Sequence, residues 1–345
     1  MDYLNSSSQF VKPAPVDPAA QQLLHELPPA LACLLVSTTI LYTAIYLLLK
    51  GSHALHAIST FLSVGLFAAS PYVAPLNCIA ARCIYNFAIE IGIMKALDLF
   101  ARRNNLPKYI YEPTPPAPTL AALLLTELRY ESFTPNQIRH SAHEQSFSEH
   151  NQYLIHICMF AVFQMLPQIP PVIAFEILLA IYIIWTSMQL LLRYKSSPAL
   201  FGPLYHGDSL AGLWTETWHN AFAAPCMSLA FSPVRNTLCA LGVPKKMAKG
   251  AGMLAVFVLM GFFHVYALLP LLSAEGLRRI LIFFAGNGLL TVLEFAVWGK
   301  RKHWLKAAMA WGVETAFASW TVQGMEFPDG LRNLRWSQVC GGAGW

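Results

Sequence analysis

Eight apolar segments separated by polar stretches dominate the pattern of this chain. Most are close to the roughly 20 residues that a helix needs to cross the hydrocarbon core of a bilayer. A single segment crosses lipid as a helix because a helix satisfies its backbone polar groups internally. The pattern therefore predicts eight membrane-spanning helices, at residues 27–49, 55–76, 79–100, 153–168, 172–192, 251–272, 280–298 and 305–322. The expected fold class is an all-α polytopic membrane protein with a single domain over residues 1–345.

The polar segments complete this organisation. Residues 1–27 form a polar tail without the basic start and cleavage site of a signal peptide, so the first apolar segment is expected to act as an uncleaved anchor. Pro71 and Pro75 predict a kink or break in the second span. Residues 101–152 and 193–250 are expected to be long non-spanning stretches with amphipathic surface helices.

The third apolar segment is unusual because it contains Arg82, Glu90, Lys95 and Asp98. Ionisable residues in a spanning helix normally face the interior of the bundle or an aqueous cavity. We expect that arrangement here. The alternative is a helix that lies flat at the membrane interface.

Composition supports the membrane assignment. Hydrophobic residues make up 56% of the chain and charged residues 12%, whereas ordinary soluble domains carry about 25% charged residues. The net charge of +5 is not gathered into a basic stripe, so no nucleic-acid partner is expected. The seven cysteines form no CxxC pair and mostly lie in apolar runs. They are expected to pack as small hydrophobic residues and to form neither disulfides nor metal sites.

The distribution of Lys and Arg predicts the orientation. If the N-terminus faces away from the cytosol, eight spans place sixteen Lys and Arg residues on the cytosolic side and five on the other. This asymmetry fits the positive-inside rule. Both long stretches, 101–152 and 193–250, then face the cytosol.

Several common catalytic motifs are absent from the sequence. It has no GxxxxGK[ST] loop, which argues against a nucleotide-driven pump, and no GxSxG nucleophile motif. Aspartate-rich pairs that bind diphosphate through magnesium are missing, as are the repeated histidine boxes of di-iron desaturases. No metal and no permanently bound cofactor are expected.

His264 is the first candidate functional residue. It lies near the middle of the apolar segment 251–272, flanked by Phe263 and Tyr266. An imidazole costs free energy in hydrocarbon unless it is paired, and burial favours its neutral form, which accepts a proton. A functional role is one interpretation. The other is a histidine that hydrogen-bonds between helices and serves packing alone.

His219 is the second candidate, within residues 208–222. Leu210, Trp214, Trp218 and Phe222 recur every four residues, which predicts an amphipathic helix at the membrane interface with Asp208 or Ser209 as its N-cap. His219 and Asn220 lie beside this stripe. They either point into a protein cavity or belong to an exposed tryptophan anchor.

Together these residues suggest an acid–base site in the cytosolic half of the membrane. His264 would take a proton from an acceptor hydroxyl, and His219 or Asn220 would orient the reactants or donate to the developing oxyanion. A thioester donor is already activated, so direct transfer needs no serine or cysteine nucleophile.

These motifs, in this order, resemble the wax-synthase-like branch of the membrane-bound O-acyltransferases, particularly its fungal members. The resemblance rests on Ser209-Leu-Ala-Gly-Leu-Trp-Thr-Glu-Thr-Trp-His-Asn220, on Phe201-Gly-Pro-Leu204 upstream and on Gly261-Phe-Phe-His264 downstream. It covers residues 185–266, the motif-bearing catalytic region. The chain lacks an arginine that the family often has beside Trp214 and the usual acidic residue after His264.

The resemblance implies an acyltransferase that moves an acyl group, most often acetyl, from acyl-CoA to a hydroxyl of a terpenoid or another lipophilic metabolite. It implies that His264 is the catalytic histidine, with His219 preferred over Asn220 as the second catalytic residue. Trp214, Trp218, Phe263 and Tyr266 are expected to shape the substrate site. Basic cytosolic residues are candidates for the donor phosphates: Arg193, Lys195, Arg235 and Lys245. The endoplasmic reticulum membrane is the expected location.

Three alternatives remain open at this point. A long-chain wax or sterol ester synthase would use the same chemistry with a longer acyl tail. A membrane terpene cyclase would use carboxylates such as Glu90, Asp98 and Glu294 as acids, without an acyl donor. A transporter would place His264 in a permeation path, although the chain shows no internal repeat of the kind common in transporters.

Overall fold

The fold was analysed in a computed structural model that describes residues 18–138, 148–192, 198–299, 301, 303–325 and 340. The long helices are α1 (Pro18–Leu49), α2 (His53–Val73), α3 (Ile79–Ala101), α5 (Glu149–Gln164), α6 (Pro170–Leu192), α10 (Lys245–Leu268), α11 (Ala274–Trp298) and α12 (Trp304–Gln323). Shorter elements are α4 (Ala117–Thr126), η1 (Leu204–His206), α7 (Leu210–Gly212), η2 (Leu213–Thr217), α8 (Ala223–Cys226), η3 (Met227–Phe231) and α9 (Ser232–Ala240).

Each of the eight predicted segments is a helix, but fewer qualify as spans. Within the described residues, five helices are long and apolar enough to cross a membrane, namely α1, α2, α6, α10 and α11. Helix α3 carries four charged residues, α5 is only 16 residues long, and the hydropathy of α12 is too low. The helical membrane fold is therefore confirmed, whereas the count of eight spans is not.

The outer faces of the candidate spans fit a lipid environment. Large apolar side chains four residues apart lie exposed on the same helix face: Leu31 and Leu35, Ile58 and Leu62, and Leu289 and Leu293. Contiguous exposed apolar surface of this kind is rare on soluble monomers and marks an interaction or membrane surface. The burial pattern thus agrees with an integral membrane protein.

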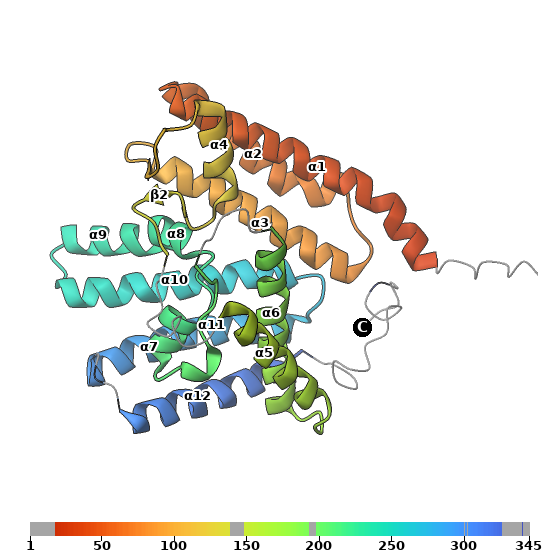
Figure 1. Cartoon of the computed structure of the whole chain (residues 1–345), viewed down its shortest axis with the longest axis vertical. Helices are drawn as coiled ribbons and strands as arrows, with labels where there is room; N and C mark the ends of the chain where they lie inside the picture. Colours follow the sequence, from red (N-terminus) through yellow and green to blue (C-terminus); the bar gives the residue numbers. More distant parts are fainter. Residues whose placement is uncertain are drawn as a thin grey trace, which may run out of the picture.

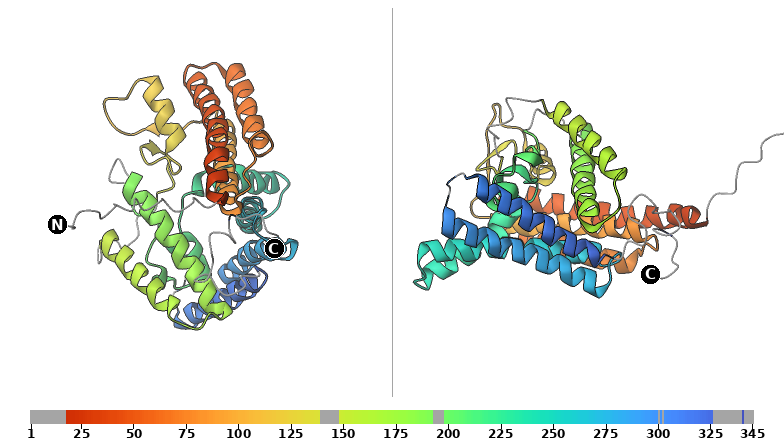
Figure 2. Two further views of the ribbon diagram at one scale, coloured as in Figure 1. Left: turned by 90° about the vertical axis from the view of Figure 1, so that its right-hand side faces the viewer. Right: turned by 90° about the horizontal axis from the view of Figure 1, so that it is seen from below.

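The helices form two packed groups crossed by a hairpin (Figure 1). In one group α1, α2 and α3 pack side by side with α4 against α1, and in the other α9, α10, α11 and α12 lie together. Helix α10 also packs against α3 and joins the groups. The α5–α6 hairpin crosses the long helices at a steep angle, with α6 packed on α12 (Figure 2).

The first long non-spanning stretch departs from the all-helical expectation. Strands β1 (Lys108–Tyr109) and β2 (Phe133–Thr134) pair antiparallel in a two-stranded sheet, and α4 lies between them in the sequence. The predicted break in the second span is confirmed, because α2 ends at Val73, between Pro71 and Pro75.

Two of the four charged residues of α3 are buried inside the protein. Lys95 and Asp98 are 3% and 0% exposed, whereas Arg82 is exposed. Asp98 accepts hydrogen bonds from Arg102 Nε at 2.6 Å, from the Tyr130 hydroxyl at 2.6 Å and from the Ser228 hydroxyl. Burial and the Asp98 carboxylate raise the pKa of Tyr130 above its usual range. The interior prediction is confirmed for Lys95 and Asp98, and this cluster ties α3 to the β2 region and to η3.

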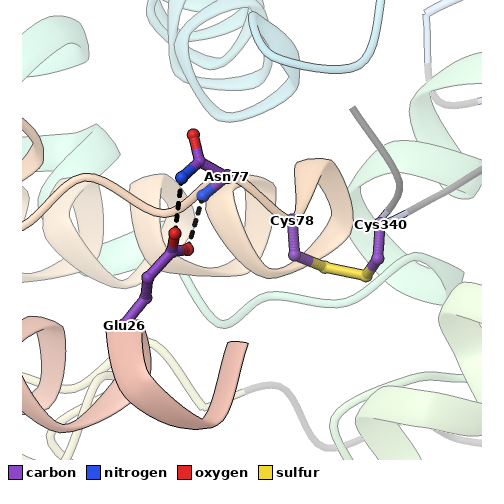
Figure 3. Close-up of a disulfide and its surroundings, with 4 residues drawn as sticks. All are labelled: Glu26, Asn77, Cys78 and Cys340. Atoms are coloured by element: carbon purple, nitrogen blue, oxygen red, sulfur yellow. Dashed lines mark hydrogen bonds between the residues drawn. A yellow bond between two sulfur atoms is a disulfide. The ribbon is translucent and has the colours of Figure 1, made fainter. Parts of the chain in front are cut away.

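Two cysteines correct the expectation that none forms a disulfide. Cys78, just before α3, is bonded to Cys340 across 262 residues of sequence (Figure 3). Glu26 of α1 lies beside it and accepts hydrogen bonds from the backbone and side chain of Asn77. Disulfides form in oxidising compartments. The pairing therefore agrees with the predicted orientation, which places both cysteines on the side away from the cytosol.

Candidate active site

A cavity of about 200 Å³ lies between α6, α10, α11, α12 and the turn η2. Its walls are mostly aromatic and aliphatic, with Phe175 from α6, Phe283 and Phe284 from α11, and Trp311 from α12. Three residues singled out in the sequence line it, namely His264, Trp214 and Trp218. The cavity is thus apolar with few polar groups, as small-molecule sites usually are.

His264 is held in a defined orientation on α10. Its Nδ1 donates to the backbone carbonyl of Met260 at 2.8 Å, and its ring stacks on Phe284 with centroids 4.3 Å apart. Because a carbonyl only accepts, Nδ1 carries the hydrogen of the neutral ring and Nε2 carries the lone pair. This is the arrangement that a general base needs.

Close packing of α10 on α11 determines how near the His264 imidazole lies to α11. A Cβ on Gly261, one turn before His264, would lie 2.9 Å from Leu281 Cδ1 and 3.3 Å from Phe284 Cβ. A Cβ on Gly288 of α11 would lie 2.7 Å from Phe257 Cβ. The two glycines allow an approach that any larger residue would prevent.

The segment that carries Trp214 is a short broken turn, so the predicted amphipathic helix over residues 208–222 is wrong. Ser209 caps α7, accepting from the Gly212 N–H at 2.9 Å. Turn η2 is π-helical and closes with Trp218 N–H bonding to Leu213 O at 2.7 Å, after which Trp218 is extended. The spacing of four residues in the sequence therefore does not correspond to one continuous face.

Contacts from α11 explain the short turn. Glu294 accepts hydrogen bonds from the backbone N–H groups of Leu210 at 2.8 Å and Ala211 at 3.3 Å, and its carboxylate lies 3.5 Å from Lys306 Nζ. These N–H groups are the unpaired donors at the start of a helix. A carboxylate at this position accepts hydrogen bonds from these groups. Its negative charge also interacts favourably with the positive end of the helix dipole.

Replacing Glu294 with alanine is expected to loosen this turn. The change leaves two backbone donors without their acceptor, at a cost of about 1–3 kcal/mol per unsatisfied group, and removes the carboxylate partner of the largely buried Lys306, which keeps its bond to the Gly299 carbonyl. Hydrogen–deuterium exchange of residues 210–218 should become faster while exchange of α10 stays unchanged. Unaltered exchange over residues 210–218 would show that Glu294 does not hold the turn.

Trp214 points into the protein and not toward the membrane interface. Its Nε1 donates to Glu314 Oε1 at 2.8 Å, and Asn287 Oδ1 lies 3.4 Å from the same nitrogen. The indole packs against the rings of Phe257 and Phe284, at centroid distances of 5.4 and 6.0 Å. Trp214 is thus a wall of the cavity, and its contact with substrate stays a prediction.

His219 and Asn220 are not brought into this cavity. His219 lies among the rings of Trp185, Phe201 and Phe222, with centroids 5.4–5.9 Å away. Asn220 is 5% exposed, accepts from Arg129 Nη1 at 3.1 Å and donates to the Gln137 carbonyl at 2.7 Å. Its amide therefore holds the loop 129–137. The expectation that either residue shares one cavity with His264 is not met.

A match to a known protein family covers part of the chain that builds this site. Residues 197–286 match the membrane bound O-acyl transferase family. Over 149 residues the chain is 29% identical to the probable long-chain-alcohol O-fatty-acyltransferase 2 of Arabidopsis thaliana. That alignment covers 42% of this chain and 42% of the relative, so the chain spans about two fifths of the relative's length. No solved structure matches the chain.

The resemblance inferred from the motifs agrees with this family match over residues 197–286. The segment contains Trp214, Trp218, His219 and His264, together with the α11 residues that stack on the imidazole. It ends before α12. The match does not test the fungal terpenoid subtype.

The other two aromatic residues predicted to contact substrate lie elsewhere. Phe263 is buried against Phe87 and Phe222, on the side of α10 that faces α3 and α8. The Tyr266 carbonyl accepts from Asn86 Nδ2 of α3 at 3.2 Å. Neither residue lines the cavity, so their expected role in shaping it is not met.

The basic residues predicted to contact the acyl donor are either exposed or outside the described residues. Arg235 is exposed on α9, where its guanidinium bonds to Asn236 and lies 5.5 Å from the Phe231 ring centroid. Lys245 is exposed at the start of α10. Arg193 and Lys195 lie outside the described residues. Contact with the acyl donor therefore stays a prediction for all four.

Glu314 of α12 is the cavity residue that the sequence analysis missed. It is largely buried, lines the same cavity as His264 and accepts from the Trp214 indole. The sequence does contain a signal for Glu314, because a carboxyl within an apolar segment is a functional candidate by default. None of the carboxylates named for a terpene cyclase, Glu90, Asp98 and Glu294, lines the cavity.

Proposed function

We propose that this protein transfers an acyl group from acyl-CoA to a hydroxyl of a lipophilic acceptor in the membrane, with His264 as the general base. The observation that carries the proposal is the orientation of His264 in an apolar cavity, where the bond from Nδ1 to Met260 leaves the lone pair on Nε2. The O-acyltransferase match over residues 197–286 supports the same chemistry independently.

The reaction needs only one proton carrier. His264 Nε2 takes the proton of the acceptor hydroxyl as that oxygen attacks the thioester carbonyl carbon. The carbon–sulfur bond then breaks, an ester is released, and the CoA thiolate leaves with the proton that the imidazolium returns. General-base catalysis of this kind contributes roughly 10²–10⁴-fold to a rate. The apolar walls supplied by Phe283, Phe284 and Trp214 exclude water, which would otherwise compete as the nucleophile.

The acyl group is proposed to be short, most simply acetyl, and the acceptor to be a terpenoid or a related lipophilic alcohol. A cavity of about 200 Å³ is smaller than the roughly 300–1,000 Å³ of sites that enclose drug-sized ligands. It suits a small acyl group beside the reacting carbon of the acceptor. The proposed location is the endoplasmic reticulum membrane, with acyl-CoA arriving from the cytosol.

A long-chain ester synthase is the second candidate, favoured by the relative from Arabidopsis thaliana. That protein is named for transfer of fatty acyl groups to long-chain alcohols. The chemistry at His264 would be the same, and only the length of the acyl chain would distinguish the two functions.

Membranes that contain the protein are expected to transfer acetyl from acetyl-CoA to a cyclic terpenoid alcohol at least about tenfold faster than palmitoyl from palmitoyl-CoA. The reason is the size of the cavity, which discriminates chain lengths through the space available beside His264. The measurement is initial ester formation with radiolabelled acyl-CoAs of increasing chain length, against membranes without the protein.

Each other outcome of that assay assigns a different function. Faster transfer of palmitoyl would support the long-chain synthase. Conversion of a polyprene substrate without acyl-CoA would support a cyclase, and absence of transfer from every acyl-CoA would refute the proposed function.

A further inference from the structure

The polar groups of the cavity wall are mostly used within the protein. Trp311 Nε1 donates to the Gly207 carbonyl at 2.9 Å, and the Thr321 hydroxyl donates to the Phe317 carbonyl at 2.9 Å. Trp214 Nε1 is bound to Glu314, as described above. These donors are therefore already paired when a ligand enters. His264 and the Glu314 carboxyl keep the capacity to accept a further hydrogen bond.

The buried position of the Glu314 carboxyl costs free energy. A carboxyl group in an apolar environment loses its hydration unless hydrogen bonds replace it. Its two oxygens can accept about four hydrogen bonds, and the side chains of Trp214 and Asn287 supply only part of these. A hydrocarbon ligand would cover this carboxyl without giving it a donor.

The two acceptors line one cavity but are not hydrogen-bonded to each other. His264 comes from α10 and Glu314 from α12, and both line the cavity. No hydrogen bond or ion pair within the described residues joins them, since His264 is bonded to Met260 and Glu314 to Trp214. A ligand in this space therefore meets two separate hydrogen-bond acceptors set in apolar walls.

We propose that Glu314 binds a second hydroxyl group of the acceptor, so that the preferred substrate is a lipophilic diol acylated at the hydroxyl nearer His264. This inference rests on the proposed function and names its substrate class. A binding site built around a hydrogen bond to a substrate hydroxyl discriminates strongly against an analogue without it, because the buried protein group then stays unpaired. A plain long-chain alcohol would leave the remaining acceptor capacity of Glu314 without a donor.

The test compares two acceptors that share one carbon skeleton, a cyclic terpenoid diol and the corresponding mono-alcohol. The readout is the ratio of kcat/KM for the diol to that for the mono-alcohol, which does not depend on how much of the protein is folded. Wild type should prefer the diol by at least about tenfold, the range expected when a buried acceptor is left unpaired. Glu314→Leu should lower the ratio to about one, and Glu314→Gln, which keeps an acceptor oxygen for Trp214, should give an intermediate ratio.

Glu176 of α6 offers a matched control. Its carboxyl is fully buried and accepts from Gln168 Nε2 at 2.7 Å, but it does not line the cavity. Glu176→Gln and Glu176→Leu should therefore keep the wild-type ratio. A ratio that stays at the wild-type value in Glu314→Leu overturns the proposal and leaves Glu314 as a support for Trp214. An equal loss with both acceptors also overturns it, because Glu314 would then act at the reacting hydroxyl.

Binding separates this inference from the proposed function. The dissociation constants of the diol and the mono-alcohol can be measured from the tryptophan fluorescence of the purified protein, since Trp214, Trp218 and Trp311 line the cavity. Tighter binding of the diol to wild type, lost in Glu314→Leu, supports the inference even if no acyl-CoA reacts. Equal affinity for both compounds in wild type overturns it even if acyl transfer is observed.

Discussion

Replacing His264 with alanine is expected to lower kcat/KM for acyl transfer by about 10²–10⁴-fold, the contribution of a well-placed general base. The variant removes the only imidazole that lines the cavity in the described part of the chain. Without it the acceptor hydroxyl must attack as a neutral alcohol, with no group positioned to take its proton. The measurement is initial-rate kinetics with acetyl-CoA and a terpenoid alcohol.

His156 provides a closely matched control for this variant. Its Nδ1 donates to the carbonyl four residues earlier, Gln152, at 2.7 Å, and its ring stacks on Tyr182 with centroids 3.8 Å apart. His264 makes the same two kinds of contact, with Met260 and Phe284. His156→Ala therefore removes an equivalent buried ring outside the cavity, and it should change thermal stability while keeping kcat/KM near the wild-type value.

The comparison of the two histidines has clear consequences. A loss confined to His264→Ala supports the general base, and recovery of part of the rate with added imidazole would strengthen that conclusion. Equal losses in both variants would assign the effect to packing. Undiminished transfer in His264→Ala would exclude His264 as the base.

Local signals in the sequence were enough to locate most of the helices and part of the site. The lengths of the apolar segments predicted all eight long helices. The isolated histidine in an apolar segment predicted His264, which lines the cavity. Both depend on residues close together in the chain. The count of eight spans is not confirmed, because α3 is too charged, α5 too short and α12 too low in hydropathy to qualify as candidate spans.

Features that depend on distant contacts were not predictable in this way. The turn at Trp214 is short because Glu294, 84 residues from Leu210, binds its backbone. A spacing of four residues fits a continuous helix and this broken turn equally well. The Cys78–Cys340 disulfide spans 262 residues, and spacing rules examine only neighbouring cysteines.

The composition of the cavity was missed for the same reason. His219 is adjacent in sequence to Trp218, yet only Trp218 lines the cavity, because the chain is extended there and not helical. Glu314 reaches the cavity from α12, which lies outside the segment that resembles the O-acyltransferases. Which helices share a cavity is decided by their packing, and a single sequence does not record it.

Replacing Asp98 with alanine is expected to destabilise the protein by about 3–5 kcal/mol, the usual cost of removing one partner from a buried charge pair. The carboxylate is fully buried and accepts from Arg102, Tyr130 and Ser228, so the variant removes the acceptor of Arg102 Nε and of the Tyr130 hydroxyl next to the buried Lys95. Thermal unfolding in detergent measures the effect. Glu275→Ala is the matched control, because its carboxylate pairs with Arg278 and Arg279 while 41% exposed, and such surface pairs contribute only about 0–1 kcal/mol. A melting temperature of Asp98→Ala no lower than that of Glu275→Ala would contradict the prediction, since the cluster that joins α3 to Tyr130 and η3 would then contribute no more than a surface ion pair.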